Sequence, residues 1–294
     1  GAFYGCTGLE KAVLSTNQTI IPPSMFQGCT SLKEVILPSK LDYIGNEAFQ
    51  DCTSLENIVI PDSCTTIMSA AFKNCTSLKE LRLEDGDIDL DMKHSSEYDY
   101  YYDDIANYDY HSLFHDCPLE ILYLGRNLQY KFGRRYVYYY GDRYNNYYSP
   151  FYNKRELKNV IIGDLVTTIG EGLFNNCISL ESITIPKNVK SIQNAFADCT
   201  SLKELHIEDG CAELEMGYAE MNEEASYSSD YYYGLFHDCP LEWLYIGRNL
   251  TYIVVDQTGG RTKYIDSPFE KIKTLKSVTI GDSVTVIGER LFEE

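Results

Sequence analysis

Apolar residues recur along the chain at fixed intervals and never gather into one long run. Residues 32–37 read Leu-x-x-Val-x-Leu, a proline follows, and further apolar positions come at Leu41, Ile44 and Phe49 before the pattern restarts. Near copies of this segment follow one another every 22–23 residues over much of the chain. A period in the twenties predicts stacked coils, in which each coil buries its apolar side against its two neighbours.

The pattern also assigns the parts of one coil. Residues 32–37 fit a short strand, and Pro38 ends it because proline has no N–H to donate to a sheet. Residues 41–44 return along the opposite side of the coil. The segment 48–52 is expected to form a short helical turn, from which Phe49 enters the core.

Phenylalanine marks the core position of successive coils. The spacing of the phenylalanines predicts a strand-dominated solenoid of about eleven coils of 22–23 residues. We expect a parallel β-sheet on its concave face, and short strands and helical turns on the other side. The eleven positions are Phe3, Phe26, Phe49, Phe72, Phe114, Phe151, Phe174, Phe196, Phe236, Phe269 and Phe292.

Four of the intervals are longer than one repeat and contain Tyr-rich insertions. Because the insertions and their flanks match in pairs, we expect residues 1–294 to be a single solenoid with an internal duplication, about 75–174 and 199–292. The chain starts and stops within a coil, so we expect a fragment of a longer protein. The paired insertions are 84–112 with 208–234, and 129–149 with 251–267.

The insertions carry strand signals of their own. The segments 88–92 (IDLDM) and 212–216 (AELEM) alternate apolar and acidic residues, as half-buried strands do. The segment 251–267 places two strand-like runs on either side of Gly259-Gly260, which predicts a hairpin there and in its earlier copy, 129–149.

The net charge and the spacing of the cysteines make several kinds of partner and site improbable. The formal net charge of −19 disfavours nucleic acid and anionic membranes as partners, and no apolar run is long enough to span a bilayer. Eight of the ten cysteines occupy one slot of the repeat, which favours a ladder of buried thiols over disulfides or metal sites. Cys64 and Cys211 are expected in a second apolar slot.

The coil resembles the BspA-like class of leucine-rich repeats over nearly the whole chain outside the insertions. The residues that carry this resemblance include Ile44-Gly45, Ala48-Phe49, Cys52, Ser54-Leu55 and Ile58-Val59-Ile60-Pro61. The resemblance implies a surface-exposed or secreted bacterial or protist protein that adheres to host matrix proteins or to other cells. It implies no catalytic residues and no cofactor, and the Tyr-rich insertions depart from the plain repeat.

The residues on either side of each inward strand position are expected to face outward and to provide the binding surface. Exposed Trp and Tyr are strong anchors at interfaces, and Tyr clusters supply rigid contact area. The alternative is that the insertions cover these strands, or that the tyrosines pack on the flank of the coils. The candidate binding residues are Arg82, Tyr123, His206, Trp243 and Tyr245 on strands, and Tyr100, Tyr102, Tyr138, Tyr140 and Tyr232 in the insertions.

Other polar clusters suggest little chemistry. Asp85, Asp87, Asp89 and Asp91 could offer oxygen ligands to calcium, but they match no EF-hand loop. His115-Asp116 and His237-Asp238 are expected to make structural hydrogen bonds, and no zinc-protease, P-loop or nucleophile-elbow motif is present. The sequence therefore predicts a non-enzymatic extracellular module that binds a protein or a glycan, without a metal site. A structural spacer is the alternative, and an enzyme is a third reading.

Overall fold

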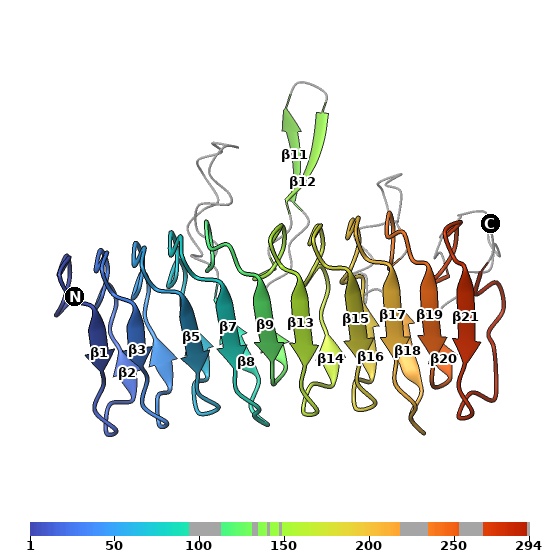
Figure 1. The fold of residues 1–294 in the computed structure, drawn as a ribbon, viewed down its shortest axis with the longest axis horizontal. Helices are drawn as coiled ribbons and strands as arrows, with labels where there is room; N and C mark the ends of the chain where they lie inside the picture. The colour runs from blue at the N-terminus through green and yellow to red at the C-terminus, as the bar shows by residue number, and fades with distance from the viewer. Residues whose placement is uncertain are drawn as a thin grey trace. The chain divides into compact units, whose positions relative to one another are not determined.

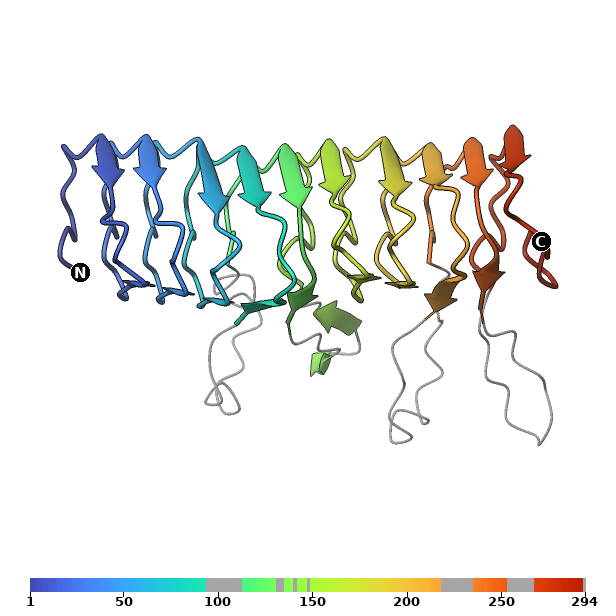
Figure 2. The same cartoon turned by 90° about the horizontal axis from the view of Figure 1, so that it is seen from below.

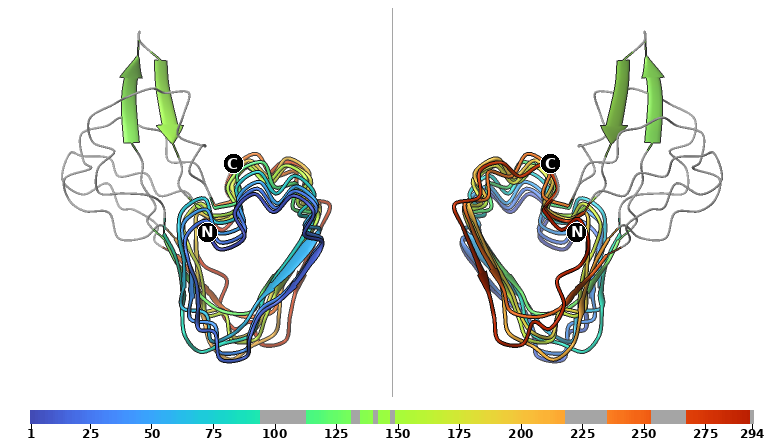
Figure 3. Two further views of the ribbon diagram at one scale, coloured as in Figure 1. Left: turned by 90° about the vertical axis from the view of Figure 1, so that its left-hand side faces the viewer. Right: turned by 90° about the vertical axis from the view of Figure 1, so that its right-hand side faces the viewer.

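The computed structural model describes residues 1–93, 113–130, 149–217, 235–252 and 267–292, together with the backbone of 135–139 and 142–146. The chain divides into two compact units, Gly1–Phe151 and Tyr152–Glu294. Each unit is a stack of coils, and Figure 3 shows a coil end-on as a three-sided loop. The predicted duplication has other boundaries than these units and stays a prediction.

In the first unit, one set of strands lines one side of the coils and a second set, mostly of two residues each, lines another (Figures 1 and 2). We call the two sets, by the side that they line, the long strands and the short strands. The long strands are β1 (Lys11–Val13), β3 (Glu34–Ile36), β5 (Asn57–Ile60), β7 (Glu80–Leu83) and β9 (Ile121–Leu124). The short strands, all in one parallel sheet, are β2 (Ile20–Ile21), β4 (Tyr43–Ile44), β6 (Thr66–Ile67), β8 (Leu90–Met92) and β10 (Leu128–Gln129). Every pairing among these strands joins one coil to the next, which is the predicted architecture.

The second unit repeats this arrangement. Its long strands are β13 (Asn159–Ile162), β15 (Ser182–Ile185), β17 (Glu204–Ile207), β19 (Trp243–Ile246) and β21 (Ser277–Ile280). Its short strands are β14 (Thr168–Ile169), β16 (Ser191–Gln193), β18 (Leu214–Gly217) and β20 (Leu250–Thr251). The alternating segments 88–92 and 212–216 thus contribute β8 and β18, as the sequence predicted.

The hairpin expected in 129–149 is confirmed, because β11 (Arg135–Tyr139) pairs antiparallel with β12 (Asp142–Asn146). Of its expected copy, 251–267, residues 253–266 lie outside the described residues. The helical turns do not extend into helices, and the described part of the chain contains none. Glu47 and Asp51 have φ of 57° and 61°, which interrupts any helix, and Phe49 N–H donates to Ala71 O of the next coil at 2.8 Å.

The phenylalanine ladder is the centre of each core. Neighbouring rings stack with centroids 5.2–5.6 Å apart from Phe3 to Phe151, and 5.5–5.8 Å apart from Phe174 to Phe292. These separations are within the favourable range for aromatic pairs. Phe3 and Phe292 are 39% exposed, whereas Phe49 and its equivalents inside the stacks are buried.

The predicted ladder of buried thiols is confirmed for seven of its eight cysteines and has a hydrogen-bonding role; Cys6, in the first coil, is exposed. Cys52 Sγ donates to Phe26 O of the preceding coil at 3.2 Å, and Cys75, Cys117 and Cys199 make the same bond to their preceding phenylalanines. All ten cysteines are free thiols. Burial raises the pKa of the Cys52 thiol to about 12 and also raises the pKa of Cys75, so these two thiols stay neutral donors at physiological pH.

The prediction for Cys211 is wrong, because this residue is exposed while Cys64 is buried. Strand register shows the cause. Nine residues separate Ile207 from Met216, whereas seven separate the paired positions Ile185 and Ile192. The two additional residues bulge outward and carry Cys211 into solvent.

A buried arginine fills the space behind each such bulge, which the sequence analysis missed. Arg126 has no exposed surface and donates to Pro61 O at 2.7 Å, Asp62 O at 2.7 Å and Cys64 O at 2.8 Å. Its equivalent in the second unit, Arg248, donates to two carbonyls of the coil at 186–187, at 2.6 and 2.8 Å. Burial lowers the pKa of both guanidinium groups. Backbone carbonyl oxygens therefore accept the hydrogen bonds of these buried guanidinium groups, in the role that a carboxylate often has.

Candidate binding surface

The outward-facing positions of the long strands are where the sequence placed them. Along β17 and β19, Leu205 and Leu244 point into the core while the residues on either side of each face out. Register pairs Glu204 with Trp243 and His206 with Tyr245. Each unit therefore presents two outward rows of side chains. One row is formed by the first residue of each long strand and the other by the third.

Trp243 is the largest exposed side chain of these rows in the second unit. It is 43% exposed at the start of β19, between Glu204 and Ser277 of the adjacent strands. Lys276 Nζ lies 5.4 Å from the ring centroid and also forms a 2.6 Å ion pair with Glu242. The indole is thus held beside a cation while much of its surface remains free for contact.

Tyr245, two residues along the same strand, is fixed by two neighbours. His206 stacks on its ring with centroids 4.5 Å apart and planes 8° apart. Its hydroxyl donates to the carboxylate of Asp209 at 2.8–3.0 Å, and this hydrogen bond is the main cause of the raised pKa of Tyr245. The hydroxyl therefore stays protonated at neutral pH, and the three side chains form one rigid group.

The first unit builds a similar group from Arg82, Tyr123 and Asp85. Arg82 Cζ lies 3.7 Å from the centroid of the Tyr123 ring, a close cation–π contact. The Tyr123 hydroxyl donates to both carboxylate oxygens of Asp85 at 2.8 Å. Burial, followed by the bond to Asp85, raises the pKa of Tyr123. Four of the predicted strand residues thus belong to two equivalent clusters.

An apolar stripe continues from this cluster in the first unit. Val13, Ile36 and Val59 occupy the same outward row and are 65%, 45% and 44% exposed. In the second row, Lys11 and Glu34 form an exposed ion pair at 2.8 Å. Protein–protein interfaces have an apolar core and a polar rim.

The aspartates considered for calcium do not converge. Asp85 is bonded to Tyr123, Asp89 accepts a hydrogen bond from Gln129 at 3.0 Å, and Asp91 is paired with Lys93 at 3.3 Å. Because these carboxylates have separate partners, they form no oxygen cage.

The predicted insertion residues are not tested by the structure. Tyr138 lies in β11, where only the backbone is described, opposite Arg143 of β12. Tyr100, Tyr102, Tyr140 and Tyr232 lie outside the described residues.

Sequence reasoning missed the partners that hold the aromatic side chains. Asp209, Glu242 and Lys276 lie outside the outward-facing strand positions from which the candidates come. A signal was available for Asp85 and Asp209. Each aspartate comes two residues after the last residue of a long strand, β7 or β17, and the next long strand carries the tyrosine that it binds.

A family model described as BspA type leucine rich repeat region matches in six copies, over residues 1–98, 147–257 and 230–294. The chain belongs to this family. The BspA type repeat accounts for the coil period, the parallel sheets and the leucine positions seen in both units. Its family members are leucine-rich repeat proteins, a class that generally acts through contacts with other proteins.

Solved structures of similar chains are bacterial leucine-rich repeat proteins. One from T. pallidum is 23% identical, with 71% of this chain and 73% of that chain covered and a TM-score of 0.37. A leucine rich cell surface protein from Faecalibacterium prausnitzii is 21% identical, with coverage of 88% and 62% and a TM-score of 0.32. One from Bacteroides ovatus is 17% identical, with 86% of each chain covered and a TM-score of 0.32. The chain thus spans less than two thirds of the Faecalibacterium protein.

No curated protein matches this BspA type chain. Within the residues that the structure describes, there is no helix with the length and apolar character needed to cross a membrane.

Proposed function

We propose that this protein is a non-enzymatic binding module, displayed outside the cell, that recognises a protein or a glycan through the outward rows of its long strands. The observation that carries the proposal is Trp243. The indole is 43% exposed, and the paired positions on the neighbouring strands hold Glu204 and Ser277. A large exposed aromatic residue in a polar row is typical of a contact anchor.

The groups around the indole suit recognition. The Tyr245 ring, held by His206 and Asp209, is already ordered before a ligand arrives, so binding costs little side-chain entropy. Lys276 and Glu242 add charged hydrogen-bonding groups at the edge of Trp243. An aromatic face with polar groups at its edge fits an apolar side chain or the face of a sugar ring.

The first unit supports recognition of a protein more than of a glycan. Its row combines the apolar stripe Val13, Ile36 and Val59 with the Arg82–Tyr123 pair. Arginine and tyrosine are enriched at interface anchors. The Tyr-rich insertions, with Tyr100, Tyr102, Tyr138, Tyr140 and Tyr232, belong to the same proposal as a further contact surface. Extracellular display is proposed from the family resemblance.

The test is binding of the chain to an array of extracellular-matrix proteins and host glycans. The Trp243→Ala variant and the matched Ile121→Ala variant, which changes the equivalent position on β9, are assayed in parallel. A ligand that Trp243→Ala loses and Ile121→Ala keeps supports the proposed site. A ligand that both keep moves the site to the insertions. Absence of binding by the native chain favours a structural spacer and contradicts the proposal.

A further inference from the structure

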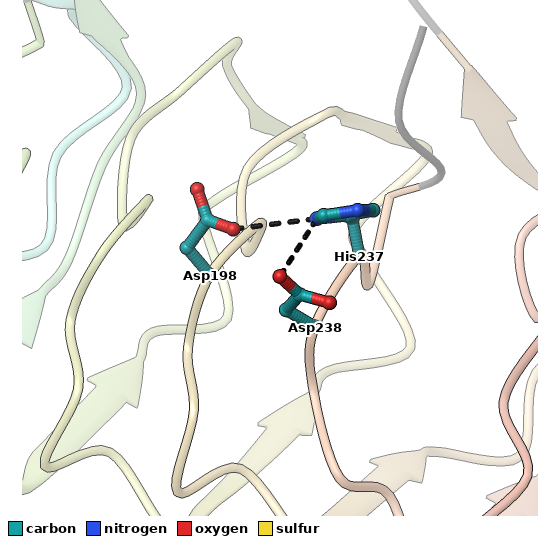
Figure 4. Close-up of side chains that lie close together, drawn as sticks. All are labelled: Asp198, His237 and Asp238. Atoms are coloured by element: carbon teal, nitrogen blue, oxygen red, sulfur yellow. Dashed lines mark hydrogen bonds and ion pairs between the residues drawn. The ribbon is translucent and has the colours of Figure 1, made fainter. Parts of the chain in front are cut away.

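A second polar cluster lies in the turns of the coils, away from the long strands. Asp198, His237 and Asp238 come from two adjacent coils of the second unit, and Figure 4 shows both carboxylates directed at the same edge of the imidazole ring. Asp198 N–H donates to His237 O at 2.8 Å, which holds the two turns together. The ligand-bearing side chains therefore project from a fixed backbone.

One ring nitrogen of His237 faces two carboxylate oxygens, and its contact with Asp198 Oδ1 is a long hydrogen bond. His237 Nδ1 lies 3.3 Å from Asp198 Oδ1 and 3.5 Å from Asp238 Oδ2. Charge-assisted N–H···O⁻ bonds are about 2.7–2.9 Å long, and one Nδ1–H cannot serve both oxygens well. A tetrahedral ion with ligands at about 2.0–2.2 Å would separate neighbouring ligand atoms by about 3.3–3.6 Å. The two nitrogen–oxygen separations match that spacing, and the two carboxylate oxygens lie within 4.8 Å of each other.

The first unit contains a natural comparison. There the corresponding residues are Asn74, His115 and Asp116, with Asn74 N–H donating to His115 O at 2.8 Å, as Asp198 does to His237. Asn74 and Asp198 have the same left-handed backbone, with φ of 58° and 62°. The Asn74 amide, however, donates to Asp51 Oδ1 at 2.8 Å. The first unit thus keeps the turn and lacks one anionic ligand.

We propose that Asp198, His237 and Asp238 form a binding site for a divalent transition-metal ion of the zinc class. One imidazole nitrogen and two carboxylate oxygens are ligands that such ions take. The ion would neutralise two carboxylates that adjacent coils hold within 4.8 Å of the histidine nitrogen and of each other. The structural hydrogen bond that the sequence suggested for His237 is present, with Asp198 as its partner at 3.3 Å, and the ion would take the place of its proton. The proposed site is independent of the proposed ligand-binding rows.

The experiment is isothermal titration of the untagged full chain with zinc chloride, in a background where the exposed Cys6 and Cys211 are replaced by serine. The proposal predicts one saturable site. Asp198→Asn and His237→Ala should each weaken zinc affinity at least tenfold, about the loss that even outer-shell changes cause. Zinc should raise the melting temperature of the background chain and not that of Asp198→Asn.

Asp198→Asn recreates the side chain that the first unit accommodates at Asn74, so it should leave the metal-free melting temperature unchanged. The converse change, Asn74→Asp, should raise the stoichiometry from one zinc ion to two. Absence of saturable binding up to about 1 mM zinc overturns the proposal. Binding that both Asp198→Asn and His237→Ala leave unchanged also overturns it, because the ion would then lie elsewhere.

Discussion

Arg126 donates a 2.7 Å hydrogen bond to the carbonyl oxygen of Pro61, which belongs to a coil two turns of the solenoid earlier. In the coil between them, the step from Leu83 to Met92 is nine residues, whereas the step between their strand partners, Ile60 and Ile67, is seven. The two additional residues make this coil bulge outward. The guanidinium fills the space that this bulge leaves. Gly125 makes the approach possible, because a Cβ there would lie 2.5 Å from Leu83 O. The coil and its arginine therefore form one structural unit.

Replacing this arginine should destabilise the fold strongly. Arg126→Met removes donors from the carbonyls of Pro61, Asp62 and Cys64. Each buried carbonyl left without a donor costs about 1 kcal/mol or more, so we expect a loss of about 3 kcal/mol in the free energy of unfolding. Urea denaturation measures this change.

Arg155→Ala is the matched control, since Arg155 is exposed. It should change the free energy of unfolding by less than about 0.5 kcal/mol. Equal effects of the two substitutions would show that the carbonyl contacts of Arg126 contribute nothing to stability.

The buried thiols should make the fold sensitive to alkaline pH. The folded-state pKa is about 12 for Cys52 and about 11 for Cys64, because burial disfavours the thiolate, whereas an exposed thiol has a value of 9.0. A raised folded pKa means that this stability is complete below pH 9 and is lost above it, as the unfolded chain releases protons first. Between pH 9 and 11, each thiol should cost about 1.4 kcal/mol per pH unit.

Cys52→Ser isolates this effect, because serine can still donate to Phe26 O but does not titrate in this range. The free energy of unfolding of the variant, followed by urea denaturation at several pH values, should fall less steeply than that of the native chain by about 1.4 kcal/mol per pH unit. Identical slopes would mean that the thiol ionises as easily in the fold as in the unfolded chain.

The phenylalanine ladder should differ in strength between its interior and its ends. Phe49→Ala removes a buried ring stacked on both sides and should lower the free energy of unfolding by about 3–5 kcal/mol. Phe3→Ala removes a ring that is 39% exposed and stacked on one side, so its cost should be clearly smaller. Calorimetric melting of both variants tests the ladder, and equal losses would contradict it.

The sequence predicted what the repeat itself determines. Phe49 and Cys52 recur at a fixed period, so their burial could be predicted without knowing any contact. Cys211 could not be placed, because its slot depends on how many residues lie between paired strand positions, and register is a property of the neighbouring coil. Arg126 follows a glycine and has the features of a surface turn residue; only the bulge of the preceding coil explains its burial.

The candidate binding surface, too, could be predicted only in part from the sequence. Strand alternation predicted that Trp243 and Tyr245 face outward, because side chains on a strand alternate between its faces. Their partners were not predicted, since Asp209 and Lys276 reach them from neighbouring coils, and only the position of Asp209 just after its strand offered a signal. The metal proposal depends on a contact between Asp198 and His237 across adjacent coils, which no local motif encodes.

The affinity of the Trp243→Ala variant for a matrix protein or glycan that the native chain binds is the decisive measurement for a binding site on the outward rows. The structure predicts a loss of about 2 kcal/mol or more in binding free energy, roughly a thirtyfold weaker Kd, as for an interface anchor. Ile121→Ala, at the equivalent position of β9, should preserve the affinity, and both variants should melt close to the native chain. An unchanged Kd for Trp243→Ala would contradict a binding site on the outward row.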